Sequence, residues 1–164
     1  MLSLAAAAAI AGTGYLSWRS LASATPAPDV PYTLLDGSRA RLGALRGEVV
    51  LVNFWATTCA SCIREMPQLV ATHDKFSARG LQTLAVAMSY DPPARVATFA
   101  ESRRLPFGVV IDNTGHIAQA FGDVRLTPTT FVVDKRGRIV KRHVGEPDFV
   151  ALQALVEKLL AAPA

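Results

Sequence analysis

Residues 49–67 read VVLVNFWATTCASCIREMP and contain both cysteines of the 164-residue chain, Cys59 and Cys62. The opening VVLVNF is a nearly continuous apolar run, which is typical of a strand covered on both faces. After the cysteines, apolar residues recur at helical spacing as far as about Arg79. Pro67 falls inside this stretch, where we expect a kink. The two thiols therefore lie where a buried strand is followed by a helix.

A cysteine at the start of a helix is well placed to ionise. Unpaired backbone N–H groups and the positive end of the helix dipole stabilise an anion there, and the thiolate is the form that attacks a disulfide. Cys62 follows Cys59 by one helical turn, so it can resolve a mixed disulfide formed at Cys59. We therefore expect a redox-active Cys59–Cys62 disulfide and no separate cofactor or metal.

Other uses of the cysteine pair are weaker. A structural zinc site takes four ligands, and the three histidines, His73, His116 and His143, are scattered along the chain. A disulfide that closes so short a loop removes little entropy from the unfolded chain. Inert core cysteines are the remaining alternative, but the polar Thr57 and Thr58 beside them indicate an exposed turn.

The rest of the chain alternates strands and helices. In chain order the patterns predict hairpin strands at 32–35 and 39–42, strands at 81–88 and 107–111 separated by a helix with Asp91 as its N-cap, a short helix within 113–122, hairpin strands at 129–133 and 138–144, and an amphipathic helix from Asp148 to Leu160. This order predicts an α/β fold, in which helices cover both faces of a central mixed sheet.

The N-terminal region differs in kind from the rest. MLSLAAAAAIAGTGYLSW has no charge before Arg19 and is shorter than the roughly 20 residues of a membrane span. Ala22-Ser23-Ala24 matches a signal-peptide cleavage site, although no basic segment precedes it. We expect residues 1–24 to be a signal peptide or membrane anchor, residues 25–31 a linker, and residues 32–164 one domain. This predicts a periplasmic or other extracytoplasmic location.

The charge pattern does not favour nucleic acid as a partner. The net charge is +4, and the basic residues of 135–142 flank the turn DKRGR. No aromatic residues alternate with them, so we interpret them as a solvated hairpin tip.

VNFWATTCASCIREMPQL and the later LTPTTFVVDKRGRIV together resemble the TlpA/ResA-like extracytoplasmic thiol–disulfide oxidoreductases of the thioredoxin superfamily. The resemblance covers residues 29–160 and implies a thioredoxin fold with an added N-terminal β-hairpin. By position, Cys59 would be the nucleophile and Cys62 the resolving thiol. Pro128 would be a cis-proline that faces the sulfurs, and Thr127 would help to set the redox potential.

Glu65 matches an acidic residue that relatives use to handle protons near the thiols. The alternative is a solvated carboxylate paired with Arg64 or another base, and the sequence leaves both open. Trp55 is retained as in the family. Two departures are Thr58, where a tryptophan commonly precedes the first cysteine, and Asn53, where thioredoxin carries a buried acid.

The resemblance implies reduction of disulfides in exported proteins, for example in cytochrome c maturation, with electrons from a transmembrane thiol donor. If the N-terminal segment is retained, the inner membrane is a further partner. A thiol peroxidase of the peroxiredoxin type and a copper-delivery module are the alternatives. The first needs hydrogen-bond donors around one cysteine, and the second is disfavoured because Sco-type copper carriers use a wider cysteine spacing.

Overall fold

The computed structural model describes residues 24–164. The predicted signal peptide or anchor therefore lies outside the described residues except for Ala24. Within residues 24–164, no helix is both long enough and apolar enough to cross a bilayer.

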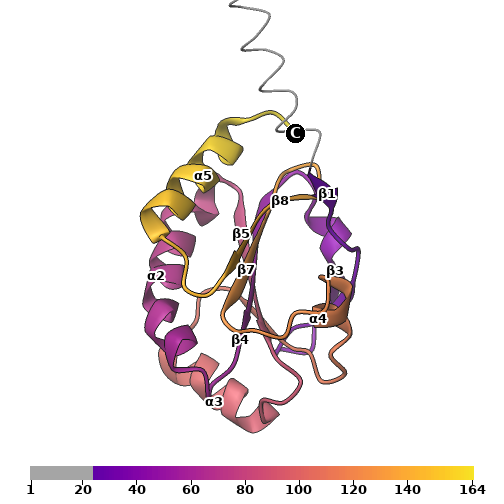
Figure 1. Ribbon diagram of the computed structural model, residues 1–164, viewed down its shortest axis with the longest axis vertical. Coiled ribbons are helices and arrows are strands. Elements are labelled where there is room, and N and C mark those ends of the chain that lie inside the picture. The colour runs from indigo at the N-terminus through magenta and orange to yellow at the C-terminus, as the bar shows by residue number, and fades with distance from the viewer. Residues whose placement is uncertain (1–23) are drawn as a thin grey trace, which may run out of the picture.

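A six-stranded mixed sheet forms the centre of the molecule (Figure 1). Its strands, in spatial order, are β1 (Thr25–Pro26), β8 (Arg138–Val144), β7 (Thr129–Val133), β4 (Val49–Trp55), β5 (Leu81–Ala87) and β6 (Gly108–Ile111). β4, β5 and β6 are parallel, whereas β7 runs antiparallel to β4 and β8 antiparallel to β7. The predicted mixed sheet is confirmed.

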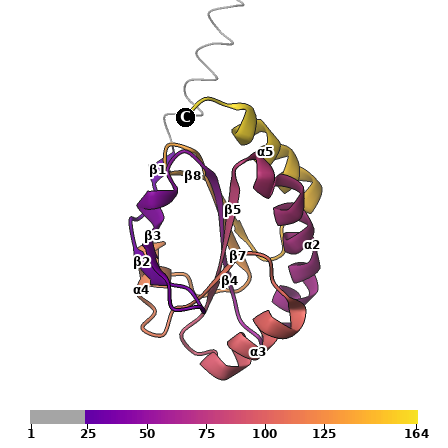
Figure 2. The same cartoon turned by 180° about the vertical axis from the view of Figure 1, so that it is seen from behind.

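Two layers cover the sheet, as Figures 1 and 2 show from opposite sides. One layer consists of α2 (Ala60–Phe76), α3 (Pro93–Arg103) and α5 (Phe149–Ala161). The other consists of α4 (His116–Ala120), the hairpin of β2 (Pro31–Thr33) and β3 (Arg39–Arg41), and the short 3₁₀ helix η1 (Leu42–Leu45). A second 3₁₀ helix, η2 (Ser77–Arg79), follows α2.

β4 explains why the sheet needs cover on both faces. All seven of its residues are buried, and successive side chains point to opposite faces of a strand. Leu51 and Trp55 pack into the α2–α3–α5 layer, whereas Val52 and Phe54 pack into the hairpin layer. The polar Asn53 alternates with Leu51 and Trp55, so it faces α2.

The segment predicted as a linker, residues 25–31, is built into the fold. Thr25 pairs with Ile139 of β8, and the Ala27 N–H donates to the Gly137 carbonyl at 2.9 Å. Proline-rich composition suggests a linker, but a proline is accommodated at the outer edge of a sheet, where no ladder hydrogen bond is lost. The domain therefore begins before residue 32.

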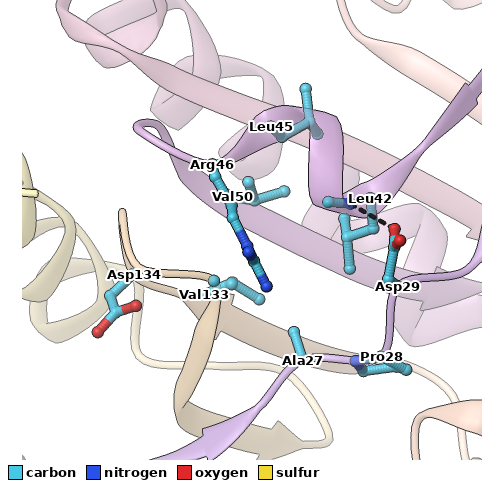
Figure 3. Close-up of a pocket in the computed structure, with 11 residues that line it drawn as sticks. Ala27, Pro28, Asp29, Leu42, Leu45, Arg46, Val50, Val133 and Asp134 are labelled. Atoms are coloured by element: carbon cyan, nitrogen blue, oxygen red, sulfur yellow. Dashed lines mark hydrogen bonds between the residues drawn. The ribbon is translucent and has the colours of Figure 1, made fainter.

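Asp29 ties this segment to η1. Its Oδ1 accepts the Gly43 N–H at 2.8 Å, the dashed line in Figure 3. A Cβ on Gly43 would lie 2.8 Å from the same oxygen, so any other residue there would push the Asp29 carboxylate away. Figure 3 also shows Arg46 reaching across a small pocket toward Val133. This pocket lies at the start of β4, whereas the cysteines follow its end.

Two predicted helix starts have different outcomes. The helix predicted from Asp148 is α5, and Asp148 is its N-cap, which accepts hydrogen bonds from Val150 N and Ala151 N. Asp91 is not the N-cap of α3: Pro92 holds that position without a side-chain cap. Pro67 lies inside α2, which continues to Phe76.

Candidate active site

Cys59 and Cys62 form a disulfide at the junction of β4 and α2. Cys59 is the N-cap residue of α2, and its Sγ accepts the Cys62 N–H at 3.2 Å. Cys62 is 0% exposed, whereas Cys59 is partly exposed. Of the two cysteines, only Cys59 is accessible to a substrate. Its Sγ accepts the Cys62 backbone N–H, a hydrogen bond that stabilises a thiolate.

Glu65 is buried one turn after Cys62. It is 1% exposed, and its Oε1 accepts a hydrogen bond from Asn53 Nδ2 at 2.9 Å. Its other oxygen, Oε2, is buried without a hydrogen-bond partner. Arg64 pairs with Glu146 at 3.1 Å. The alternative of a solvated Glu65 paired with Arg64 is therefore wrong.

Burial raises the pKa of Glu65 from 4.5 to about 7. Removing a carboxylate from water penalises its charged form, and the hydrogen bond from Asn53 only partly offsets this penalty. A group with a pKa near neutrality both accepts and donates protons readily at physiological pH.

The sequence showed Asn53 only as a departure from thioredoxin and did not predict its hydrogen bond to Glu65. Besides its bond to Glu65, Nδ2 donates to Thr130 Oγ1 on β7 at 2.9 Å. The available signal was its place between Leu51 and Trp55, on the same face of β4. A polar residue at such a position needs a partner from the covering helix.

Trp55 is the last residue of β4, four positions before Cys59. Its ring is fully buried and lies 5.2 Å from the Phe99 ring, between centroids. Its carbonyl accepts the Met88 N–H at 3.0 Å. Trp55 therefore joins the end of β4 to the loop after β5 and to α3.

The Thr127–Pro128 peptide bond is cis, the isomer implied by the family resemblance. Pro128 precedes β7, and Thr129 pairs with Phe54 near the end of β4. Thr127 and Pro128 thus lie at the same end of the sheet as Cys59. Thr127 Oγ1 lies 3.4 Å from Tyr90 Oη.

Large apolar side chains are exposed around this cis bond. Tyr90 is 58% exposed, Leu126 65% and Val144 54%. Leu126 directly precedes Thr127, and Val144 pairs with Thr129. Exposed apolar side chains grouped together indicate a binding surface.

The histidines do not join the site. His73, on α2, has its Nδ1 3.2 Å from Oγ1 of Thr83 on β5. His116 is the first residue of α4 and its Nδ1 lies 3.0 Å from Thr114 Oγ1. Burial lowers the pKa of both His73 and His143. Among residues 24–164, no group of three or more metal-binding side chains is found.

Comparison with known proteins agrees with this geometry. The family model described as Redoxin matches residues 22–155. Thiol-disulfide oxidoreductase ResA of Geobacillus thermodenitrificans is 37% identical over 126 residues, which cover 77% of this chain and 71% of the relative. The ResA of Geobacillus kaustophilus is 38% identical over 120 residues, 73% of this chain and 68% of the relative. This chain belongs to the ResA thiol-disulfide oxidoreductases of the Redoxin family.

Solved structures support the fold. A putative thioredoxin from Neisseria meningitidis has a TM-score of 0.77 at 34% identity, covering 82% of this chain and 90% of that one. A putative thiol:disulfide interchange protein DsbE from Chlorobium tepidum has a TM-score of 0.77 at 28% identity, covering 84% and 97%. The predicted thioredoxin fold is confirmed. With its Cys59–Cys62 disulfide, this ResA-family chain is a thiol–disulfide oxidoreductase.

Proposed function

We propose that this protein reduces disulfides of exported proteins, with Cys59 as the attacking thiol and Cys62 as the resolving thiol. The observation that carries the proposal is the unequal exposure of the two bonded sulfurs: Cys62 is 0% exposed and Cys59 is partly exposed. A partner disulfide reaches Cys59 first, and Cys62 can act only on a bond already made to Cys59.

The reaction starts from the dithiol. The Cys59 thiolate attacks one sulfur of the client disulfide, a Cys59–client bond forms, and the other client sulfur leaves as a thiolate. The Cys62 thiolate then attacks Cys59 Sγ and releases the second client thiolate. Two electrons pass to the client, and the protein is left as the Cys59–Cys62 disulfide.

Glu65 is proposed to take the proton from Cys62 before this second step. Its place one turn after Cys62, its burial and its pKa of about 7 support the role. The proton then passes to a departing client thiolate, so Glu65 returns to its starting state.

The client is proposed to bind along the cis-proline loop. Thr127 and Pro128 would lie beside the client backbone, and the exposed Tyr90, Leu126 and Val144 would contact apolar client side chains. Burying one such side chain contributes about 1.5–3 kcal/mol. Protein disulfides with apolar neighbours are therefore the favoured substrates.

The location is proposed to be the periplasm or the extracytoplasmic face of the membrane. This rests on the apolar sequence before Arg19 and the Ala22-Ser23-Ala24 pattern. In that oxidising compartment the dithiol must be regenerated, and we assign this step to a transmembrane thiol donor. Apo-cytochrome c, whose haem-attachment motif contains two cysteines, is a fitting client.

The proposal is tested by trapping. Cys62→Ser should accumulate a mixed disulfide between Cys59 and a disulfide-containing protein such as insulin, because no resolving thiol remains. Cys59→Ser should form no adduct and reduce no insulin. An adduct through Cys62, or full activity of Cys59→Ser, contradicts the proposal.

The reduction potential of the cysteine pair tests the direction of electron flow. Equilibration with glutathione gives the reduction potential of the Cys59–Cys62 pair. We expect a value near that of thioredoxin, about −270 mV, and a value near about −120 mV would identify an oxidant.

A further inference from the structure

Asp91 and Thr57 connect two loops next to the disulfide. The Asp91 carboxylate is 1% exposed. Its Oδ2 accepts the Thr57 backbone N–H at 2.5 Å, and its Oδ1 accepts the Thr57 hydroxyl at 2.6 Å. Both carboxylate oxygens are thus engaged by one residue that lies two positions before Cys59.

The parallel sheet brings these residues together. Trp55 and Ala87 are paired at the ends of β4 and β5. Because parallel strands end at the same edge, the loops that follow them are neighbours. Thr57 lies in the first loop and Asp91 in the second.

The usual explanation for an aspartate at this position does not apply. Asp91 precedes α3 but does not cap it, since α3 has no side-chain cap at its N-terminus. A buried carboxylate is costly to desolvate, and the cost is tolerated where its hydrogen bonds are needed. The hydrogen bonds that Asp91 makes are directed at the cysteine turn.

The turn is held at three points. Met88 N donates to the Trp55 carbonyl at 3.0 Å, Cys59 N donates to the Ala56 carbonyl at 3.1 Å, and Asp91 holds Thr57 between them. Of the three, the bonds to Asp91 are the only ones made to a charged side chain, and charge-assisted bonds are the strongest.

We propose that Asp91 is a positioning residue that acts through Thr57 to keep Cys59 Sγ on the Cys62 N–H at the start of α2. The inference rests on the proposed function in one respect, the role of Cys59 as the attacking thiol. In the dithiol state no S–S bond holds Cys59 in place. The clamp on Thr57 then keeps the sulfur at the helix N-terminus, where its thiolate is stabilised.

The negative charge of Asp91 and its hydrogen bonds to Thr57 have opposite effects on the reactivity of Cys59. A nearby carboxylate disfavours a thiolate, so loss of the charge alone would make Cys59 more reactive. Loss of positioning would make it less reactive. The sign of the change therefore separates the two roles.

The experiment measures the rate at which iodoacetamide alkylates Cys59 at pH 7 in the Cys62→Ser background, with urea unfolding of each variant alongside. Thr57→Val removes the hydroxyl donor and keeps the charge. We expect it to react about 3- to 10-fold more slowly, the range that corresponds to the net effect of one ordinary hydrogen bond. Asp91→Asn keeps the size but replaces the two charge-assisted hydrogen bonds by weaker neutral ones, and should also react more slowly. Thr57→Ser retains the donor and is the matched control, with an unchanged rate.

Two outcomes overturn the inference. If Asp91→Asn reacts faster, Asp91 acts through its charge. If Thr57→Val and Asp91→Asn unfold at lower urea but alkylate at the parent rate, the clamp only stabilises the fold. Either result leaves the trapping of clients by Cys62→Ser intact, whereas failure of that trapping would contradict the proposed function itself.

Discussion

Asn53 on β4 donates a hydrogen bond from Nδ2 to Oε1 of Glu65 on α2, at 2.9 Å, and both side chains are 1% exposed. The bond joins the sheet to the helix that carries the cysteines. It also lies inside a buried region, which raises the pKa of Glu65 to about 7. In thioredoxin, the buried acid lies on the strand, at the position that Asn53 occupies in this chain. Here the carboxylate comes from the helix, and the strand supplies its hydrogen-bond donor.

Replacement of Glu65 by glutamine should change the pH dependence of disulfide exchange. Glutamine is similar in size but does not titrate, so the dependence near pH 7 should disappear. The rate should fall by about 100-fold, the low end of the effect of losing a general acid–base group. Insulin reduction measured from pH 5 to 9 checks this. An unchanged pH profile would exclude Glu65 from proton transfer.

The same substitution should alter stability in a pH-dependent way. Because the folded-state pKa of Glu65 is raised from 4.5 to about 7, the folded protein binds the proton more tightly than the unfolded chain. The native protein therefore loses stability as pH rises through this window, with the full cost present above pH 7. Glu65→Gln removes that cost, of order 3 kcal/mol. Urea unfolding of the oxidised proteins should give a larger advantage for Glu65→Gln at pH 8 than at pH 4, and equal differences at both would contradict the assignment.

Substitution of Leu126 should affect protein substrates selectively. The side chain is 65% exposed, so Leu126→Ser should cost little stability but raise KM for insulin severalfold, while a small aromatic disulfide is reduced at the parent rate. Val150→Ser is the control, since Val150 is 82% exposed on α5. Equal effects of both substitutions would remove the case for a client surface beside the cis-proline.

Removal of the Asp148 side chain should weaken α5. The carboxylate accepts hydrogen bonds from Val150 N at 2.9 Å and from Ala151 N at 3.1 Å. Asp148→Ala should lower the free energy of unfolding by about 1 kcal/mol. Asp148→Asn retains an acceptor and should lose much less. Chemical denaturation measures both. If Asp148→Asn lost as much free energy of unfolding as Asp148→Ala, the effect would come from the charge and not from the cap.

The sequence alone determined much of the local structure. Residues 129–133 and 138–144 form strands with the predicted bounds, and Asp148 caps α5. These features follow from patterns of period 2 and 3.6 and from turn residues, which act between near neighbours in the chain. The position of Cys59 at a helix start came from the same kind of pattern, and the cis state of Pro128 came from the resemblance.

Only the tertiary structure decided which polar residues meet. Helical spacing left Glu65 open between a solvated and a buried position, because it does not say which face of α2 turns to the sheet. Asn53 and Thr57 gained their partners, Glu65 and Asp91, from the packing of α2 on β4 and the parallel pairing of β4 with β5. Contacts between elements depend on how whole faces pack, and residues far apart in the chain carry no local signal of that.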